Sequence, residues 1–322
     1  MRTCFVLLAI GIAIPATPAA AAPTWPTEAV RIVVPYGAGS ATDIVPRLVF
    51  EQLAPQLGQP VVVENRPGAG GTVGTGFVAN AKPDGYTLLV NSTAHTIAPA
   101  LYQKLSYDPE RDFAAVIPLG ISPNVLVVSP AKGFKTVGDL VAAAKAKPEG
   151  LTLASVGVGS ATHLSGERFC FSAGVKAVHV PFKGGAEAMA EVMAGRVDFF
   201  FGPVGLVLPL VQADKLTALV VSGTARAAAL PDVPTTREAG FAEAEYPIWF
   251  GLFAPAKTPS PVLDTLHDQA LRALQAGGIR DKLSALGVDP MVMTRAAFAA
   301  YVDKQFAVNA DLVKAIGLKP EQ

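Results

Sequence analysis

Short runs of consecutive apolar residues alternate along the chain with longer segments of helical character. The first two runs are residues 30–35 and 61–65, and residues 42–57 between them are expected to form a helix. A continuous apolar run of this length is typical of a strand buried on both faces of a sheet. The alternation therefore predicts an α/β fold with a mainly parallel sheet in each half and helices on both sheet faces.

The second half of the chain follows a similar plan. Thr136 and Asp139 have the spacing of a capping box, which predicts a helix start. Two apolar segments, residues 115–128 and 248–254, are placed to pass between two lobes. We therefore expect a discontinuous lobe 1 (residues 22–122 and 249–322) and an inserted lobe 2 (residues 123–248), an arrangement suited to hinge closure around a ligand. Further strands are predicted at residues 87–91, 124–129, 151–155, 177–181, 198–201 and 216–221.

The N-terminus has the charge order of a secretory signal peptide. Arg2 is followed by ten apolar residues, 5–14, which are too few to span a bilayer, and then by prolines and small residues. We predict a signal peptide of residues 1–21, removed before Ala22, and hence a periplasmic protein; the alternative is a buried N-terminal helix. Cys4 precedes the apolar run, so it is not placed as a lipid-anchor cysteine. Cys170 then remains as a single cysteine, which excludes an intrachain disulfide in the mature chain.

Composition narrows the class of protein. The 322 residues are 51% apolar and 16% charged, which is typical of a well-buried globular chain rather than a disordered one. Lysine plus arginine (26) balance aspartate plus glutamate (26), so no basic surplus is available for nucleic acid.

Two glycine-rich loops each join a predicted strand to a predicted helix, the place where α/β proteins bind ligands. Residues 35–43 form the first loop and residues 155–163 form the second. Free N–H groups and the helix dipole favour an anion at such helix starts, and glycines let the backbone approach it. The alternative for each loop is an ordinary turn in which a serine or threonine only caps the helix.

Two further loops carry polar groups. Lys183 is the only cation of the third loop, and is either a partner for a ligand carboxylate or a solvated lysine. Residues 91–96 form a fourth polar cluster that suits either ligand binding or helix capping. The full set of candidate ligand-binding residues is Tyr36, Gly37, Gly39, Ser40, Asp43, Ser92, Thr93, His95, Gly159, Ser160, Thr162, His163, Phe182, Lys183, Gly184 and Gly202.

Signals for catalysis, metals and cofactors are weak. Residues 68–74 match a dinucleotide loop only loosely, and neither a P-loop nor a G-x-S-x-G motif occurs. His163 and Glu167 are four residues apart, but no third metal ligand lies nearby in the sequence. We therefore expect no catalytic residues, no bound metal and no cofactor.

Seven motifs together resemble the substrate-binding proteins of tripartite tricarboxylate transporters, the Bug or TctC receptor family. They are VPYGAGSATDIVPRL, LGQPVVVENRPGAGG, PDGYTLLV, GVGSATHLSGE, VPFKGG, GRVDFFF and ALPDVPTTREAGF. The resemblance implies a type II, Venus-flytrap fold that captures a small carboxylate between its lobes and delivers it to membrane permease subunits. Three positions depart from the family pattern: Ser40, Pro46 and the pair Gly202-Pro203, of which the first and last bear on ligand choice.

The sequence therefore favours a monomeric periplasmic solute-binding receptor for a small carboxylate, with no nucleic-acid partner. Two alternatives remain open: a sensor-type receptor that docks a signalling protein, and an exported enzyme that acts on a small carboxylic acid. The sequence does not identify the carboxylate.

Overall fold

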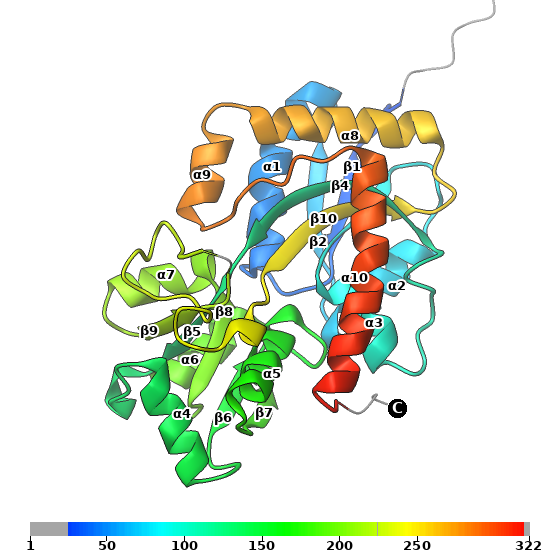
Figure 1. The fold of residues 1–322 in the computed structure, drawn as a ribbon. Coiled ribbons are helices and arrows are strands. Elements are labelled where there is room, and N and C mark those ends of the chain that lie inside the picture. Colours follow the sequence, from blue (N-terminus) through cyan, green and yellow to red (C-terminus); the bar gives the residue numbers. More distant parts are fainter. Residues whose placement is uncertain (1–24, 224, 319–322) are drawn as a thin grey trace, which may run out of the picture.

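A computed structural model describes residues 25–223 and 225–318. The predicted signal peptide, its cleavage site and Cys4 lie outside these residues. Within them, helices and strands form two α/β lobes, one above the other in Figure 1, and each lobe is built on one five-stranded sheet. No helix in the described part of the chain is long and apolar enough to cross a membrane.

The first sheet has the strand order β2-β1-β3-β10-β4, and helices cover both faces. Strands β1, β2 and β3 pair in parallel, whereas β10 runs antiparallel to both of its neighbours. Ile32 faces the core beneath helices α1, α8 and α9, and Val33 faces the aromatic core beneath α2 and α10. The strands are Val30–Val34 (β1), Val61–Asn65 (β2), Thr87–Ser92 (β3), Phe113–Ser122 (β4) and Ile248–Pro255 (β10), and the helices are Ala41–Leu57 (α1), Thr72–Ala79 (α2), Ala94–Leu101 (α3), Ser260–Gln275 (α8), Ile279–Ala285 (α9) and Arg295–Ala315 (α10).

The second sheet has the corresponding order β7-β6-β8-β5-β9, with β5 as its one reversed strand. Phe200 faces the core beneath α6 and α7, and Phe199 and Phe201 face the core beneath α4 and α5. Four of five strands therefore point the same way in each sheet, which confirms the mainly parallel prediction. The strands are Asn124–Val128 (β5), Thr152–Ser155 (β6), Val178–Pro181 (β7), Phe199–Pro203 (β8) and Thr217–Val221 (β9), and the helices are Val137–Ala146 (α4), Ala161–Ala173 (α5), Gly185–Met193 (α6) and Val204–Gln212 (α7).

Two local predictions can be checked directly. Thr136 and Asp139 form both bonds of the capping box at the start of α4, as predicted. Cys170 is the one cysteine among the described residues; it lies buried on α5, and burial raises the pKa of its thiol to about 12. The thiol is therefore held in its protonated, unreactive form.

The chain passes between the sheets at two points, and a proline lies at each. Pro123 separates β4 from β5, so the apolar stretch around it forms two strands in different sheets. Pro247 precedes β10 on the return path. Beside this return path, the Tyr246 hydroxyl donates to Asn309 Oδ1 (2.7 Å) on α10, and Asn309 Nδ2 donates to Thr96 Oγ1 (2.7 Å) on α3. Figure 1 shows α10 running from the first sheet down to the level of α5.

Candidate functional site

The first loop joins β1 to α1 and is fixed by Asp43. Gly39 has a φ of +78°, which lets the chain turn so that Ser40 stands at the helix start. The Asp43 carboxylate accepts the Gly39 N–H (2.9 Å), the Arg47 guanidinium (2.9 Å) and the Asn65 amide (2.8 Å). Burial alone would raise the pKa of Asp43, but these three donors together hold it below its ordinary value. Asp43 therefore stays ionised while it shapes the loop.

Ser40 has a hydroxyl that the fold does not use. The residue is 8% exposed, and its Oγ has no hydrogen-bond partner among the described residues. The amides of Asp43 and Ile44 donate to the Ser40 carbonyl, whereas the preceding N–H groups of Ala41 and Thr42 have no acceptor within the helix. A buried polar atom without a partner is costly, so this helix start is prepared for a ligand that accepts hydrogen bonds.

The second loop, between β6 and α5, repeats the sequence Gly-x-Gly-Ser-Ala-Thr and the backbone of the first. Gly159 has a φ of +73° and Ser160 occupies the helix start, with backbone angles within 1° of those of Ser40. Here the serine caps its helix by accepting the His163 N–H (3.3 Å) and lies 3.0 Å from the Thr162 hydroxyl. The loop thus offers the same free helix N–H groups with a hydroxyl that is already engaged.

Two histidine side chains support the second loop. His163 Nδ1 accepts the Gly159 N–H (3.3 Å), and its ring stacks on His179 at 3.7 Å between centroids. His179 Nε2 lies 2.6 Å from Ser155 Oγ, which accepts the Gly157 N–H at 3.0 Å. Burial, followed by the neighbouring His163, lowers the pKa of His179 to about 3. This chain of contacts orients the second loop.

The two helix starts meet at a small cavity between the sheets. Its volume is about 30 Å³, against roughly 10–15 Å³ needed for each water-sized group, so it has room for a pair of oxygen atoms. No charged side chain lines it. The small cavity is lined by Tyr36, Ser40, Ala41, Thr42, Ser92, Val156, Ser160, Ala161, Thr162, Pro203, Leu206, Ile248 and Phe250.

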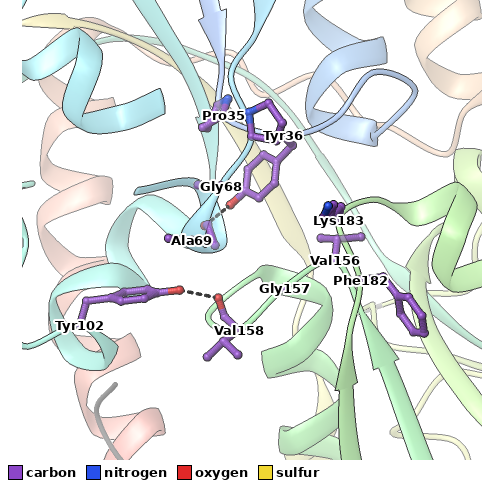
Figure 2. Close-up of a pocket in the computed structure, with 13 residues that line it drawn as sticks. Pro35, Tyr36, Gly68, Ala69, Tyr102, Val156, Gly157, Val158, Phe182 and Lys183 are labelled. Atoms are coloured by element: carbon purple, nitrogen blue, oxygen red, sulfur yellow. Dashed lines mark hydrogen bonds between the residues drawn. The ribbon is translucent and has the colours of Figure 1, made fainter. Parts of the chain in front are cut away.

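A larger cavity of about 500 Å³ adjoins the small one, and Tyr36 and Val156 line both. The Tyr36 hydroxyl donates to the Gly70 carbonyl (3.1 Å), and the Tyr102 hydroxyl donates across the cleft to the Val158 carbonyl (2.9 Å), as the dashed lines in Figure 2 show. The larger cavity is lined by Pro35, Tyr36, Pro67, Gly68, Ala69, Gly70, Gly71, Tyr102, Val156, Gly157, Val158, Phe182 and Lys183.

Seven of the sixteen candidate residues line these two cavities: Tyr36, Ser40, Ser92, Ser160, Thr162, Phe182 and Lys183. Gly39, Asp43, Gly159 and His163 shape the two loops behind them. A Cβ at Gly37 would lie 3.6 Å from the Lys183 carbonyl, so the first and third loops touch. Gly184 stands at the start of α6.

The other three candidates are not among the residues that line either cavity. Thr93 accepts the Trp249 N–H (3.1 Å) and ties α3 to β10. His95 is 2% exposed and packs among phenylalanines in the core of the first sheet, where burial lowers its pKa to about 4. Gly202 lies within β8, next to Phe200 and Val207.

The turn at residues 67–71 and Tyr102 line the larger cavity but were not among the candidates. Glycine richness marked the turn, which we assessed only as a poor dinucleotide loop. A Cβ at Gly70 would collide with the Val158 carbonyl and the Tyr102 hydroxyl. The turn at residues 67–71 therefore lies in close contact with the second loop, which contains Val158. Tyr102 stands alone in an unremarkable segment, and no sequence signal marked it.

No group of three metal-ligating side chains occurs within residues 25–223 and 225–318. His163 Nε2 lies 3.5 Å from Glu167, which is a contact between two side chains without a third ligand.

Two α/β lobes that enclose a polar cavity at paired helix starts define a periplasmic solute-binding fold. Residues 45–318 match the model of the tripartite tricarboxylate transporter family receptor, and the chain belongs to this family.

Curated and solved relatives agree with that assignment. BugT from Bordetella pertussis is 32% identical over 320 residues, covering 98% of each chain. Among solved structures, R. palustris Rpa4515 with adipate is 31% identical with a TM-score of 0.88, over 92% of this chain and 100% of that one. MatC from Rhodopseudomonas palustris with bound malate is 33% identical with a TM-score of 0.86, over 90% of this chain and 100% of that one.

Proposed function

We propose that this chain is a periplasmic receptor that captures a small carboxylate between its lobes and delivers it to a tripartite tricarboxylate-type transporter. The observation that carries the proposal is the buried, unpartnered hydroxyl of Ser40, which lines the small cavity between two helix starts. The family membership and the adipate and malate held by two related proteins support the same ligand class.

The small cavity has the chemistry of an anion site. Helix N-termini carry partial positive charge and present N–H donors, so they stabilise a negative group that accepts hydrogen bonds. A cation would meet the positive ends of two helix dipoles with no carboxylate among the lining side chains. Because no charged side chain lines the small cavity, the site would bind the carboxylate through directed hydrogen bonds rather than through an ion pair.

The residues around the two cavities also fit a receptor better than an enzyme. Ser155 and His179 form a serine–histidine contact of 2.6 Å close to the larger cavity. However, Ser155 is fully buried, and a histidine with a pKa of about 3 is a poor base near neutral pH. We therefore propose no catalytic residue, and no cofactor or metal.

The remaining parts of the proposal concern the whole protein. Lobe 1 would comprise residues 22–122 and 249–322 and lobe 2 residues 123–248, which agrees with the passages at Pro123 and Pro247. Residues 1–21 would direct export and be removed. The mature protein would act as a monomer that docks on the membrane permease subunits.

Ligand binding can be tested by thermal shift and calorimetry on the mature protein. A carboxylate at about 100 times its dissociation constant adds roughly 2.7 kcal/mol to the free energy of unfolding. At about 2–4 °C per kcal/mol, the melting temperature should rise by several degrees. The amide of the same acid is the matched control and should not bind. Stabilisation by neutral sugars or amides, with none by any carboxylate, would overturn the proposal.

A further inference from the structure

The site consists of two adjoining chambers. Hydroxyl groups and two helix starts border the small cavity beside apolar side chains, and rings, prolines, aliphatic groups and glycine backbone line the larger one. Tyr36 and Val156 belong to both linings, so one ligand can occupy the two chambers together.

The tyrosine hydroxyls that border the larger cavity already have partners. Tyr36 donates to the Gly70 carbonyl and Tyr102 donates to the Val158 carbonyl, so both donors are used in holding the walls together. Figure 2 shows the Tyr36 ring extending from the first loop toward the turn that contains Ala69. The rings of both tyrosines therefore remain as apolar lining beside Pro35 and Pro67.

Charge is scarce around the larger cavity. Lys183 is the one charged side chain that lines it, and this residue is exposed. A ligand with further carboxylates or hydroxyls would lose their hydration on entering the larger cavity, where Lys183 is the one charged side chain of the lining. Burial of an unpaired charge or hydroxyl is unfavourable, whereas burial of hydrocarbon is favourable.

We propose that the cargo is a monocarboxylate whose remainder is an apolar chain or ring. Its carboxylate lies between the helix starts in the small cavity, and its apolar body fills the larger cavity against Tyr36, Tyr102 and Val156. This inference rests on the proposed carboxylate-receptor function and narrows its ligand class. The volume of about 500 Å³ falls within the usual range for small-molecule sites and far exceeds the needs of acetate.

A homologous series of ligands tests the proposal. Dissociation constants are measured by calorimetry for acetate, butanoate, hexanoate and benzoate with the mature wild-type protein. Each added methylene should strengthen binding roughly fourfold until the larger cavity is filled. Benzoate should bind at least as tightly as hexanoate, and both should bind more tightly than succinate, malate or citrate.

A shape-conserving variant locates the effect in the cavity wall. Val156→Thr replaces a methyl group with a hydroxyl at the junction of the chambers, and should reduce the gain per methylene, measured relative to acetate binding by the same variant. Val62→Thr makes the same chemical change on β2 at a side chain that is 53% exposed and away from both cavities, so it should leave the whole series unchanged.

Failure of this inference is distinct from failure of the receptor function. If malate or citrate binds tightly while affinity does not rise from acetate to hexanoate, the apolar-body proposal is overturned and the carboxylate receptor stands. If no carboxylate of either kind binds, both proposals are overturned.

Discussion

The two loops at the cleft have nearly the same sequence and backbone but different support. Residues 37–43 and 157–163 both contain Gly-x-Gly-Ser-Ala-Thr, and each places a serine at a helix start. An ionised carboxylate, Asp43, anchors the first loop, whereas the stacked rings of His163 and His179 support the second. Similar loop geometry is therefore reached with a carboxylate on one side of the cleft and with stacked imidazole rings on the other.

The two loops also differ in whether the serine hydroxyl has a hydrogen-bond partner. Ser160 is engaged in capping its own helix, while Ser40 has no partner within the described structure. The first loop is thus built to complete its hydrogen bonds with a ligand, and the second is already complete. The comparison predicts that a change in the first loop affects mainly binding, whereas a change in the second affects folding as well.

The largest effect is expected from Ser40→Asp. A carboxylate at this position would repel a bound carboxylate, and like charges in contact cost several kcal/mol, so affinity should fall roughly 100-fold or more. Aspartate caps helices well, so the melting temperature without ligand should change little. Thr294→Asp introduces the same group at the exposed start of α10 and should bind normally. Unchanged affinity in Ser40→Asp would show that the first helix start does not hold the anion.

Gly70→Ala should separate the lobes at the second loop. The new Cβ would collide with the Val158 carbonyl and the Tyr102 hydroxyl, and overpacking of about 2 kcal/mol corresponds to roughly 30-fold weaker binding. Calorimetry and the radius of gyration of the ligand-bound protein would measure this effect.

Two control variants sharpen the Gly70 experiment. Gly58→Ala carries a similar positive φ (+66° against +61°) but has open space around the added Cβ, so it should lose stability without losing affinity. Gly37→Ala lies where the first loop meets Lys183 at an ordinary contact distance and should be tolerated. If Gly58→Ala weakens binding as much as Gly70→Ala, backbone strain rather than lobe contact is responsible.

The paired variants Ser40→Ala and Ser160→Ala compare the loops directly. Each removes one hydroxyl from the small cavity. Ser40→Ala loses a hydroxyl that is free to bond a charged ligand and should weaken binding about 10-fold, whereas Ser160→Ala should weaken it less. Only Ser160→Ala also removes a helix cap, so it alone should lower the free energy of unfolding, by about 1 kcal/mol. Urea denaturation of both variants without ligand would measure the difference, and equal losses of stability would contradict the proposed division of roles.

The effect with the least bearing on ligand binding is a pH dependence of stability from the second loop. His179 titrates near 6.5 when unfolded and at about 3 when folded, so the unfolded chain binds more protons between these values. Its contribution to stability is complete above pH 6.5 and declines as the pH falls toward 3. Asp43, whose pKa is lowered on folding, loses its contribution only below its ordinary value.

The variant His179→Asn should flatten this decline in urea denaturation between pH 7 and pH 4. The buried His95 adds a similar slope of its own, which the variant should retain. At pH 8 the His179 side chain is neutral in both the folded and the unfolded chain. The difference in the free energy of unfolding between wild type and variant at this pH therefore measures the lost packing, without the effect of titration. An unchanged slope would show that His179 does not couple protons to folding.

Strands such as β1, β2 and β3 were predictable because they are short, apolar and bounded by polar loops. Strand β4 was predicted only as part of an apolar segment that passes between lobes, because Pro123 alone separates it from β5. Helix α7 was not predicted, because its apolar residues lie on all sides and Pro209 interrupts it, which leaves no helical periodicity. The helix starts of the two loops were predictable from local glycine and hydroxyl residues. Tyr102 was not, because its role depends on Val158, which is 56 residues away in the sequence. His95 looks like a site residue in sequence, but the phenylalanines around it come from distant elements.

The buried thiol of Cys170 has a practical consequence for measurement. With a pKa of about 12 and 4% exposure, it should not react with maleimide dyes at neutral pH. A cysteine introduced at the exposed Ala38, on the rim of the first loop, would then be the one reactive thiol within residues 25–223 and 225–318. An environment-sensitive fluorophore attached there would report closure around the cargo optically, so the receptor could serve as a reagentless sensor for its own ligand.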